Sequence, residues 1–192
     1  MSARRLLKLV AFVVAGVGVA PLLLLAWGEA RLTRSEILFS AFAQLLALVP
    51  SHLGALLRGA YYFGTLRQCS WETHVGFGSL FTHRGGAMAR NVSMGAYCVI
   101  GHAEIGAEVM MGSRVSIPSG KRQHFDDQGR IDSETRFDTV RIGGKCWIGE
   151  GAIILADVGS GCIVSAGAVV IKAIPDRCIV GGNPARVIKE LS

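Results

Sequence analysis

The sequence predicts a mainly β protein, a parallel β-helix, preceded by an α-helical hydrophobic region. Two observations predict this fold. An aliphatic residue followed by a small one recurs, mostly at six-residue steps, from Val92 onward. Residues 1–70 instead hold 7 Lys and Arg against 2 Asp and Glu, and only 6 of the 25 glycines. The 192 residues are 51% hydrophobic and 18% charged, which excludes a disordered chain. We therefore expect a membrane-associating helical region over 1–70 and a repeat domain over 71–192.

The first apolar run covers residues 9–27, 19 residues without a charge, and follows Arg4, Arg5 and Lys8. This length matches the hydrocarbon core of a bilayer. The hydrophobic segment of a signal peptide is shorter, about 7 to 15 residues, and no small-x-small cleavage site ends this run. The pattern therefore favours membrane attachment over a signal peptide.

A second apolar run, residues 37–49, has 13 residues and is too short to span a bilayer alone. We expect a re-entrant or interfacial helix that ends at Pro50. Residues 52–67 then mix apolar side chains with Arg58 and Arg67, a composition typical of a helix on a membrane surface. The alternative for this segment is a helical cap packed on the C-terminal domain.

The six-residue period of the C-terminal region fits neither a helix nor a plain alternating strand, but fits one short strand and one corner per hexad. Three such sides close a triangular coil, and stacked coils bury a continuous column of aliphatic side chains. The residue after the aliphatic one must be small because the corner is tight or requires a positive φ. A second small or β-branched residue points inward four positions after the aliphatic one, which makes three of the five cysteines core hydrophobes. These inward positions are Cys98, Val109, Val115, Cys146, Ala152, Cys162 and Ala168.

A polar excursion interrupts the repeat over residues 119–139. Long excursions from a regular scaffold are often functional, and this one contains His124. We expect the chemistry of the protein to lie there.

Five segments together resemble a known family. They are the hexad repeats, the loop 119–124, the turn 147–149, the segment 164–172 and the closing sequence 182–189. The region from Val75 to Leu191 resembles the left-handed β-helix, hexapeptide-repeat acyltransferases, in particular the galactoside and xenobiotic O-acetyltransferase branch. This resemblance implies a left-handed coil, a homotrimer, coenzyme A in the groove between subunits, and acyl transfer to a hydroxyl, usually of a sugar.

The resemblance also implies roles for single residues. His124 matches the catalytic base. The positions matching those that contact the cofactor are Trp147 and Gly149 near the pantetheine arm, Ala166 through its main chain, and Lys172, Arg186 and Lys189 at the nucleotide phosphates. Glu150 departs from the galactoside enzymes, which have a serine there, so that an oxyanion contact at this turn would come from the main chain.

The chemistry supports His124 independently. A neutral imidazole can take the proton of an alcohol as it attacks a thioester, typically a contribution of about 10² to 10⁴ in rate. We expect direct transfer, since no cysteine or serine forms a nucleophile-base motif with His124. His74, His83 and His102 invite a metal site, but no two histidines lie five residues apart, so we expect no metal. The repeat domain, at about +1, also lacks the interleaved basic and aromatic residues of a nucleic-acid surface.

We therefore expect a membrane-associated O-acyltransferase that transfers an acyl group from acetyl-CoA to a saccharide, possible acceptors being a lipid-linked sugar or a surface-polysaccharide precursor. A non-catalytic, membrane-anchored trimeric scaffold is the alternative. Acyl-CoA and the unpaired cysteines belong to the cytosol. Because the basic N-terminus also prefers that side, we expect the first 50 residues to form a hairpin or a re-entrant wedge with both ends at the cytoplasmic face of a bacterial-type inner membrane. Arg58 and Arg67 would then lie near anionic headgroups.

Overall fold

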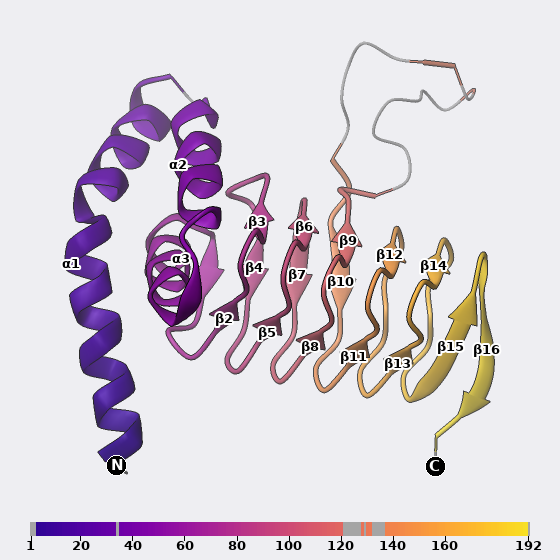
Figure 1. The fold of residues 1–192 in the computed structure, drawn as a ribbon. Helices are drawn as coiled ribbons and strands as arrows, with labels where there is room; N and C mark the ends of the chain where they lie inside the picture. Colours follow the sequence, from indigo (N-terminus) through magenta and orange to yellow (C-terminus); the bar gives the residue numbers. More distant parts are fainter. Residues whose placement is uncertain (1–2, 34, 121–127, 129, 132–136, 192) are drawn as a thin grey trace.

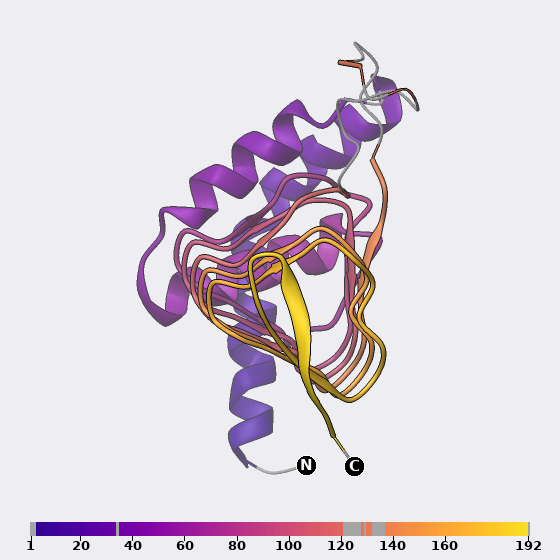
Figure 2. The ribbon, with the colours of Figure 1, turned by 90° about the vertical axis from the view of Figure 1, so that its right-hand side faces the viewer.

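A computed structural model describes residues 3–33, 35–120, 128, 130–131 and 137–191. These residues form a parallel β-solenoid with three helices gathered at one end, next to the first coil (Figures 1 and 2). The predicted parallel β-helix with a helical region before it is confirmed.

Each coil visits three parallel sheets in a fixed order. The four-stranded sheet contains β1 (Gln68–Cys69), β4 (Ala87–Met88), β7 (Ala103–Ile105) and β10 (Val140–Ile142). The seven-stranded sheet contains β2 (His74–Val75), β5 (Ser93–Met94), β8 (Met110–Met111), β11 (Trp147–Ile148), β13 (Ile163–Val164), β15 (Cys178–Gly182) and the antiparallel β16 (Ala185–Glu190). The five-stranded sheet contains β3 (Leu80–Phe81), β6 (Val99–Ile100), β9 (Ser116–Ile117), β12 (Ile153–Ile154) and β14 (Val169–Val170).

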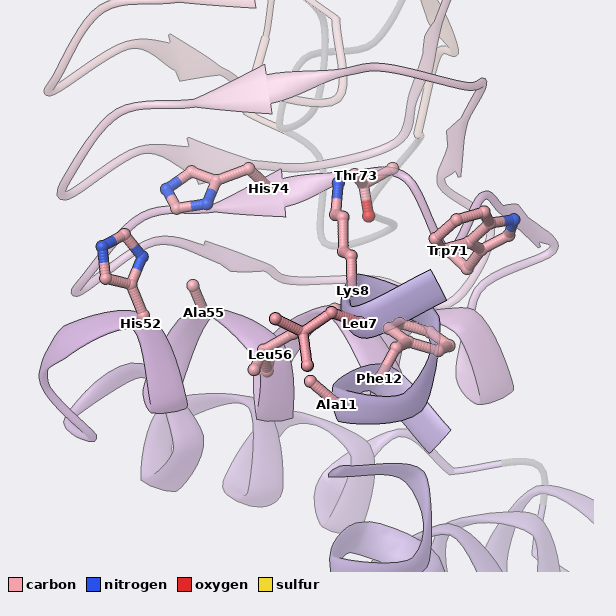
Figure 3. Close-up of a pocket in the computed structure, with 11 residues that line it drawn as sticks. Leu7, Lys8, Ala11, Phe12, His52, Ala55, Leu56, Trp71, Thr73 and His74 are labelled. Atoms are coloured by element: carbon pink, nitrogen blue, oxygen red, sulfur yellow. The ribbon is translucent and has the colours of Figure 1, made fainter. Parts of the chain in front are cut away.

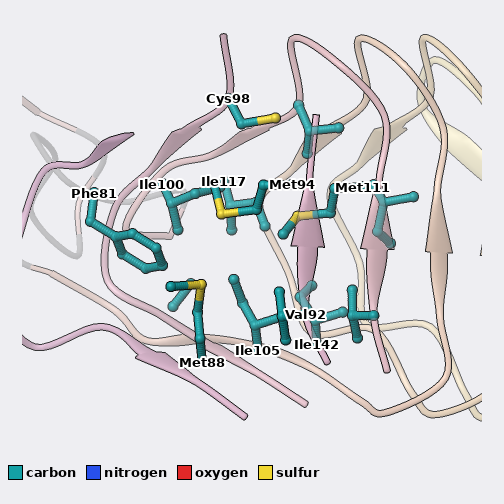
Figure 4. Close-up of a cluster of buried hydrophobic side chains, with 14 of the residues drawn as sticks. Phe81, Met88, Val92, Met94, Cys98, Ile100, Ile105, Met111, Ile117 and Ile142 are labelled. Atoms are coloured by element: carbon teal, nitrogen blue, oxygen red, sulfur yellow. The ribbon is translucent and has the colours of Figure 1, made fainter. Parts of the chain in front are cut away.

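The predicted aliphatic column forms the core of the solenoid (Figure 4). Met94, Ile100, Ile117 and Ile148 are fully buried, and each stacks on its counterpart in an adjacent coil through a parallel pair of strands. The second set of inward positions, Cys98, Val109, Val115, Cys146, Ala152, Cys162 and Ala168, is buried as well. One complete coil, β1 to β3, and the first strand of the second, β4, precede Val92, so the repeat begins earlier than the hexad pattern indicated.

The small residue after the aliphatic one is needed for close stacking rather than for a positive φ. A Cβ on Gly112 would lie 2.7 Å from the backbone nitrogen of Glu150 in the next coil. The positive φ occurs two residues further on, as at Arg114 (60°) and Gly151 (68°). Of the two reasons that the sequence left open, coil stacking is therefore the correct one.

The N-terminal helices are α1 (Ala3–Leu32), α2 (Ile37–Ala47) and α3 (Ser51–Thr65). Figure 1 shows α1 as the outermost element, beyond α2 and α3. One stripe of α1 is buried, namely Phe12, Ala15, Val19 and Ala26, while large apolar side chains on its other faces are exposed. Residues 5–32 of this helix are long and apolar enough to cross a membrane, by length and composition alone, with a mean hydropathy of 2.6 in the most apolar window.

The membrane-surface interpretation of residues 52–67 is wrong for Arg58. This side chain is 1% exposed. Its guanidinium donates hydrogen bonds to the carbonyl oxygens of Val75 (3.0 Å), Leu46 (2.9 Å) and Val49 (2.8 Å). Arg67 is exposed but forms an ion pair with Glu104 at 2.7 Å. The alternative interpretation is therefore correct for this segment: helix α3 is a cap packed on the first coil. Its apolar face and Arg58 contact the rest of the protein and not a lipid headgroup.

Candidate active site

The predicted catalytic histidine, His124, lies outside the described residues. The structure describes the two ends of its loop, which leaves the solenoid after β9 and rejoins it at β10. Ser119 is buried, and its hydroxyl accepts a hydrogen bond from the His102 backbone at 2.8 Å. Its carbonyl oxygen accepts another from the backbone of Asp138 at 3.1 Å, on the returning side. Both ends of the loop are thus held against one another and against the preceding coil.

A polar cluster surrounds this loop base. Nδ1 of His102 lies 3.4 Å from the Thr139 hydroxyl, and the ring of Phe137 is centred 4.3 Å from that of His83. His83 in turn hydrogen-bonds through Nδ1 to the Glu36 carboxylate at 2.8 Å. The loop base therefore has two imidazoles, a hydroxyl and an aromatic ring on one corner of the coil, a set of groups suited to hydroxyl-rich ligands.

The predicted cofactor residues begin at Trp147, on the outer face of the seven-stranded sheet. Its side chain is 46% exposed, and its neighbours in register are Met110 and Ile163. A shallow hollow of about 370 Å³ lies here, lined also by Asn91, Glu108 and Lys145. An exposed indole with apolar neighbours offers a surface on which an extended, partly apolar chain can lie.

Gly149 and Ala166 stack on each other at the corner that follows this sheet. The backbone of Gly149 donates to the Val164 carbonyl at 2.7 Å, and a Cβ on Gly149 would meet the backbone of Ala166. Arg186 lies in the same row. In β15, Val180 pairs with Val164 of the preceding coil, and the next residue, Gly181, pairs with Arg186 of β16. The structure therefore brings Trp147, Gly149, Ala166 and Arg186 together along one edge of the seven-stranded sheet.

The other two predicted cofactor residues lie elsewhere in this chain. Lys172 is exposed just after β14, at the far edge of the five-stranded sheet and on the corner from which the loop leaves. Lys189 is exposed on β16 and faces Ile179, at the opposite end of β15 from Arg186. Glu150, where the galactoside enzymes have a serine, is exposed and lies 3.7 Å from Arg114. At that distance and exposure the pair contributes little to stability.

The buried cysteines offer no nucleophile. Burial raises the pKa of the Cys146 thiol to about 11 and raises that of Cys98 above its ordinary value. The thiols of Cys146 and Cys162 donate hydrogen bonds to carbonyl oxygens of the next coil, at 3.0 and 3.1 Å. Within the described part of the chain, no group of three or more His, Cys, Asp or Glu is placed to hold a metal ion.

Comparisons with solved structures identify the fold. A maltose O-acetyltransferase from Clostridium difficile 630 matches with a TM-score of 0.70 and 25% identity, covering 80% of this chain and 85% of that one. A hexapeptide-repeat containing acetyltransferase from Vibrio cholerae matches with a TM-score of 0.60 and 22% identity, covering 80% of this chain and 90% of that one. A structure of this Vibrio acetyltransferase with acetyl coenzyme A has a TM-score of 0.56, 19% identity and coverage of 80% and 85%.

The chain has the hexapeptide-repeat acetyltransferase fold. No protein-family model and no curated protein matches the sequence. The expected resemblance to hexapeptide-repeat acetyltransferases is confirmed by the structural matches, and the residues that carried it extend over the solenoid.

The polar cluster at the loop base of this hexapeptide-repeat fold was not predicted as a unit. His83 and His102 are separated by the same number of residues as Leu80 and Val99, which are paired in β3 and β6. That shared spacing places both histidines on one corner of successive coils, and it is a signal that the sequence contained. Glu36 and Phe137 carry no such signal, because they reach the cluster from α2 and from the returning end of the loop.

Proposed function

We propose that this protein is a membrane-associated O-acetyltransferase that transfers an acetyl group from acetyl-CoA to a hydroxyl of a saccharide, with a lipid-linked saccharide as the acceptor. The observation that carries the proposal is the row formed by Trp147, Gly149, Ala166 and Arg186 on a solenoid that matches a maltose O-acetyltransferase. The Vibrio acetyltransferase with acetyl coenzyme A bound supports the same donor.

In this proposal the pantetheine arm lies beside the Trp147 indole and along the backbone of Gly149 and Ala166. The corner is suited to this because a glycine and an alanine leave the backbone N–H groups accessible. Arg186, at the end of the row, meets the phosphates, where a guanidinium is an effective partner. Lys172, after β14, and Lys189, on β16, add positive charge that attracts the phosphates from other parts of the assembled trimer.

His124 acts as the general base. It removes the proton of the acceptor hydroxyl while the hydroxyl oxygen attacks the thioester carbonyl. The carbon–sulfur bond then breaks as the new ester forms, and the proton passes to the departing thiolate of coenzyme A. No covalent enzyme intermediate is needed, in keeping with the raised pKa of the buried cysteines.

A homotrimer completes the site. The loop leaves from the corner between the five-stranded and four-stranded sheets, while Trp147 lies on the seven-stranded sheet, the side of the triangular coil opposite that corner. A loop from a neighbouring subunit would bring a histidine to the Trp147 face. The separation of the two halves within one chain thus supports a site shared between subunits.

The exposed apolar faces of α1 support membrane association, with this helix lying in the plane of the interface. Both ends of α1 are held to the rest of the protein. Arg5 pairs with Glu72 at 2.9 Å, and the Trp27 indole donates to the Gly64 carbonyl at 2.7 Å. Because α1 is held along its length, the first coil stays beside it. If α1 crossed the membrane, that coil would lie inside the bilayer, where its backbone groups could not be satisfied. An in-plane α1 at the cytoplasmic face keeps the acyl-CoA site in the cytosol.

Acetyl-CoA and candidate acceptors test the proposal directly. Free thiol is measured with soluble saccharides and with membrane extracts that contain lipid-linked saccharides, and products are analysed by mass spectrometry. We expect thiol release that depends on the acceptor, together with an acetyl ester on the product. Absence of both, with no binding of coenzyme A, would favour the non-catalytic scaffold.

A further inference from the structure

A cavity of about 650 Å³ lies between the N-terminal part of α1, α3 and the first coil (Figure 3). Its apolar lining comes from all three elements, with Phe12, Leu56 and Trp71 contributing large side chains. None of these residues belongs to the row around Trp147. A space of this size with a mainly apolar wall is typical of a small-molecule site.

Apart from the neutral Thr73 hydroxyl, the polar side chains of the cavity are cationic or titratable. Lys8, His52, Thr73 and His74 line it, and the described residues of the lining include no Asp or Glu. Figure 3 shows Lys8 extending from α1 toward Thr73, with the two imidazoles on one side and Trp71 on the other. Such a set of donors complements an anion.

Two arginines next to this cavity strengthen its positive potential. Arg58 lines a neighbouring hollow together with His52 and His74. Among the described residues its guanidinium donates to carbonyl oxygens and forms no ion pair with a carboxylate. Arg5 lies 5.6 Å from the Trp71 ring, and its charge is partly balanced by Glu72. A buried cation without a counter-charge exerts a field that water screens only weakly.

The cavity is continuous with the apolar surface of the protein. Leu7 lines it and is 70% exposed. Other exposed apolar side chains of the same helix include Leu6, Val10 and Val14. A ligand with a hydrocarbon chain could thus lie along α1 while its polar end enters the cavity.

We propose that this cavity binds the phosphate group of an anionic lipid, and that this lipid carries the saccharide acceptor. The inference rests on the proposed function and adds the class of acceptor. Lys8, His52 and His74 hold the phosphate, while the chain lies on the exposed face of α1 in the bilayer.

The seven-stranded sheet connects this cavity with the Trp147 hollow. His74 begins an outward-facing column that continues through Ser93 and Met110 to Trp147, each paired with the next. Three steps between adjacent strands cover about 14 Å. A saccharide attached to a phosphate at His74 would therefore extend along this face toward the acyl donor.

Binding to vesicles tests the inference without any turnover. The full-length protein is mixed with phosphatidylcholine vesicles, with or without phosphatidic acid, and bound protein is separated by flotation. We expect tighter binding to the vesicles with phosphatidic acid, and a loss of this preference of about fivefold or more in Lys8→Gln and in the His52→Gln/His74→Gln double variant. Arg31→Gln is the matched control, because it removes an exposed charge near the other end of α1.

A second pair of variants separates the cavity from general surface charge. Ala11→Phe fills the cavity, whereas Val14→Phe adds the same ring to an exposed position on the same helix. We expect Ala11→Phe alone to abolish the preference for phosphatidic acid. Equal losses in Lys8→Gln and Arg31→Gln, no effect of Ala11→Phe, or full competition by inorganic phosphate would overturn the inference. Thiol release with a soluble saccharide, measured on the same variants, shows independently whether the proposed function holds.

Discussion

Arg58 joins three parts of the protein at the scale of one side chain. It extends from α3 and reaches the last turn of α2, the second residue after that helix, and β2. The Arg58 side chain is 1% exposed, so these hydrogen bonds form in the interior, where a lost donor is costly; the Leu46 carbonyl oxygen also accepts a bond from the Val49 backbone at 3.2 Å. Composition alone could not reveal this role, because an arginine among leucines also fits a membrane surface.

Arg58→Met should lower the free energy of unfolding by about 3 kcal/mol or more, since buried acceptors lose a charged donor. Denaturant unfolding measures this loss. Arg67→Met is the matched control, because the Arg67 side chain is 58% exposed in its ion pair with Glu104. We expect its free energy of unfolding to change by less than about 1 kcal/mol. Similar losses in the two variants would contradict the assignment.

His74 makes the stability of the helical cap depend on pH. Burial lowers the pKa of His74, and the charges of His52, Arg58 and Lys8 lower it further. The unfolded chain therefore binds a proton more readily than the folded protein does. Stability should fall as the pH drops from the ordinary histidine pKa, about 6.5, toward the lower value in the folded state.

The variant His74→Gln removes this titration. Its melting temperature should decrease less than that of the wild-type protein when the pH is changed from 7 to 5. Thermal unfolding followed by circular dichroism makes the comparison. An identical decrease in both proteins would show that His74 does not carry the effect.

At the scale of a strand and its corner, the hexad pattern predicted the solenoid because each position has one physical requirement. The aliphatic residue fills the core, and the next residue must allow the coils to approach each other. The same pattern missed the coils before Val92, where Phe81 and Met88 occupy core positions and Gly85 and Gly86 form a longer corner. In this region an aromatic side chain and the longer corner between β3 and β4 interrupt the six-residue aliphatic pattern.

Two glycine variants separate stacking from backbone conformation. Gly112→Ala should lower the free energy of unfolding by about 3 kcal/mol, because the new Cβ meets the backbone of Glu150. Gly151→Ala should cost about 1 kcal/mol, the cost of a positive φ, since no atom lies within 4 Å of its Cβ. Denaturant unfolding of the two variants checks the order. A larger loss in Gly151→Ala would contradict the stacking argument.

At the scale of the whole molecule, the solenoid separates two surfaces with different chemistry. The end with α1 is apolar and has cationic side chains nearby, whereas the row around Trp147 lies on the side of the coils. In the proposed arrangement, with α1 in the bilayer interface, the solenoid would extend away from the membrane, and the Trp147 row would face the cytosol. The seven-stranded sheet would then run from the membrane to the proposed acyl-donor site.

The sequence predicted the fold, because repeats and short motifs are local. Four of the residues it proposed as cofactor contacts lie in one row of the structure, and their role stays a prediction. The sequence did not predict the cavity, since Lys8, His52 and His74 come from three separate elements. Nor did it indicate that the loop of one chain and the Trp147 face lie on opposite sides of the coil. Such relationships depend on how elements pack, which a local pattern does not encode.

The role of His124 is the central claim, and the variant His124→Ala tests it most directly. Three quantities are measured: acyl transfer from acetyl-CoA, the affinity for coenzyme A by calorimetry, and the melting temperature by thermal unfolding. We predict that transfer falls by about 10² or more, with unchanged coenzyme A affinity and melting temperature. The reason is that a general base in the loop acts on the reacting proton and not on cofactor binding or folding. Transfer within about tenfold of the wild-type rate would contradict general-base catalysis by this histidine.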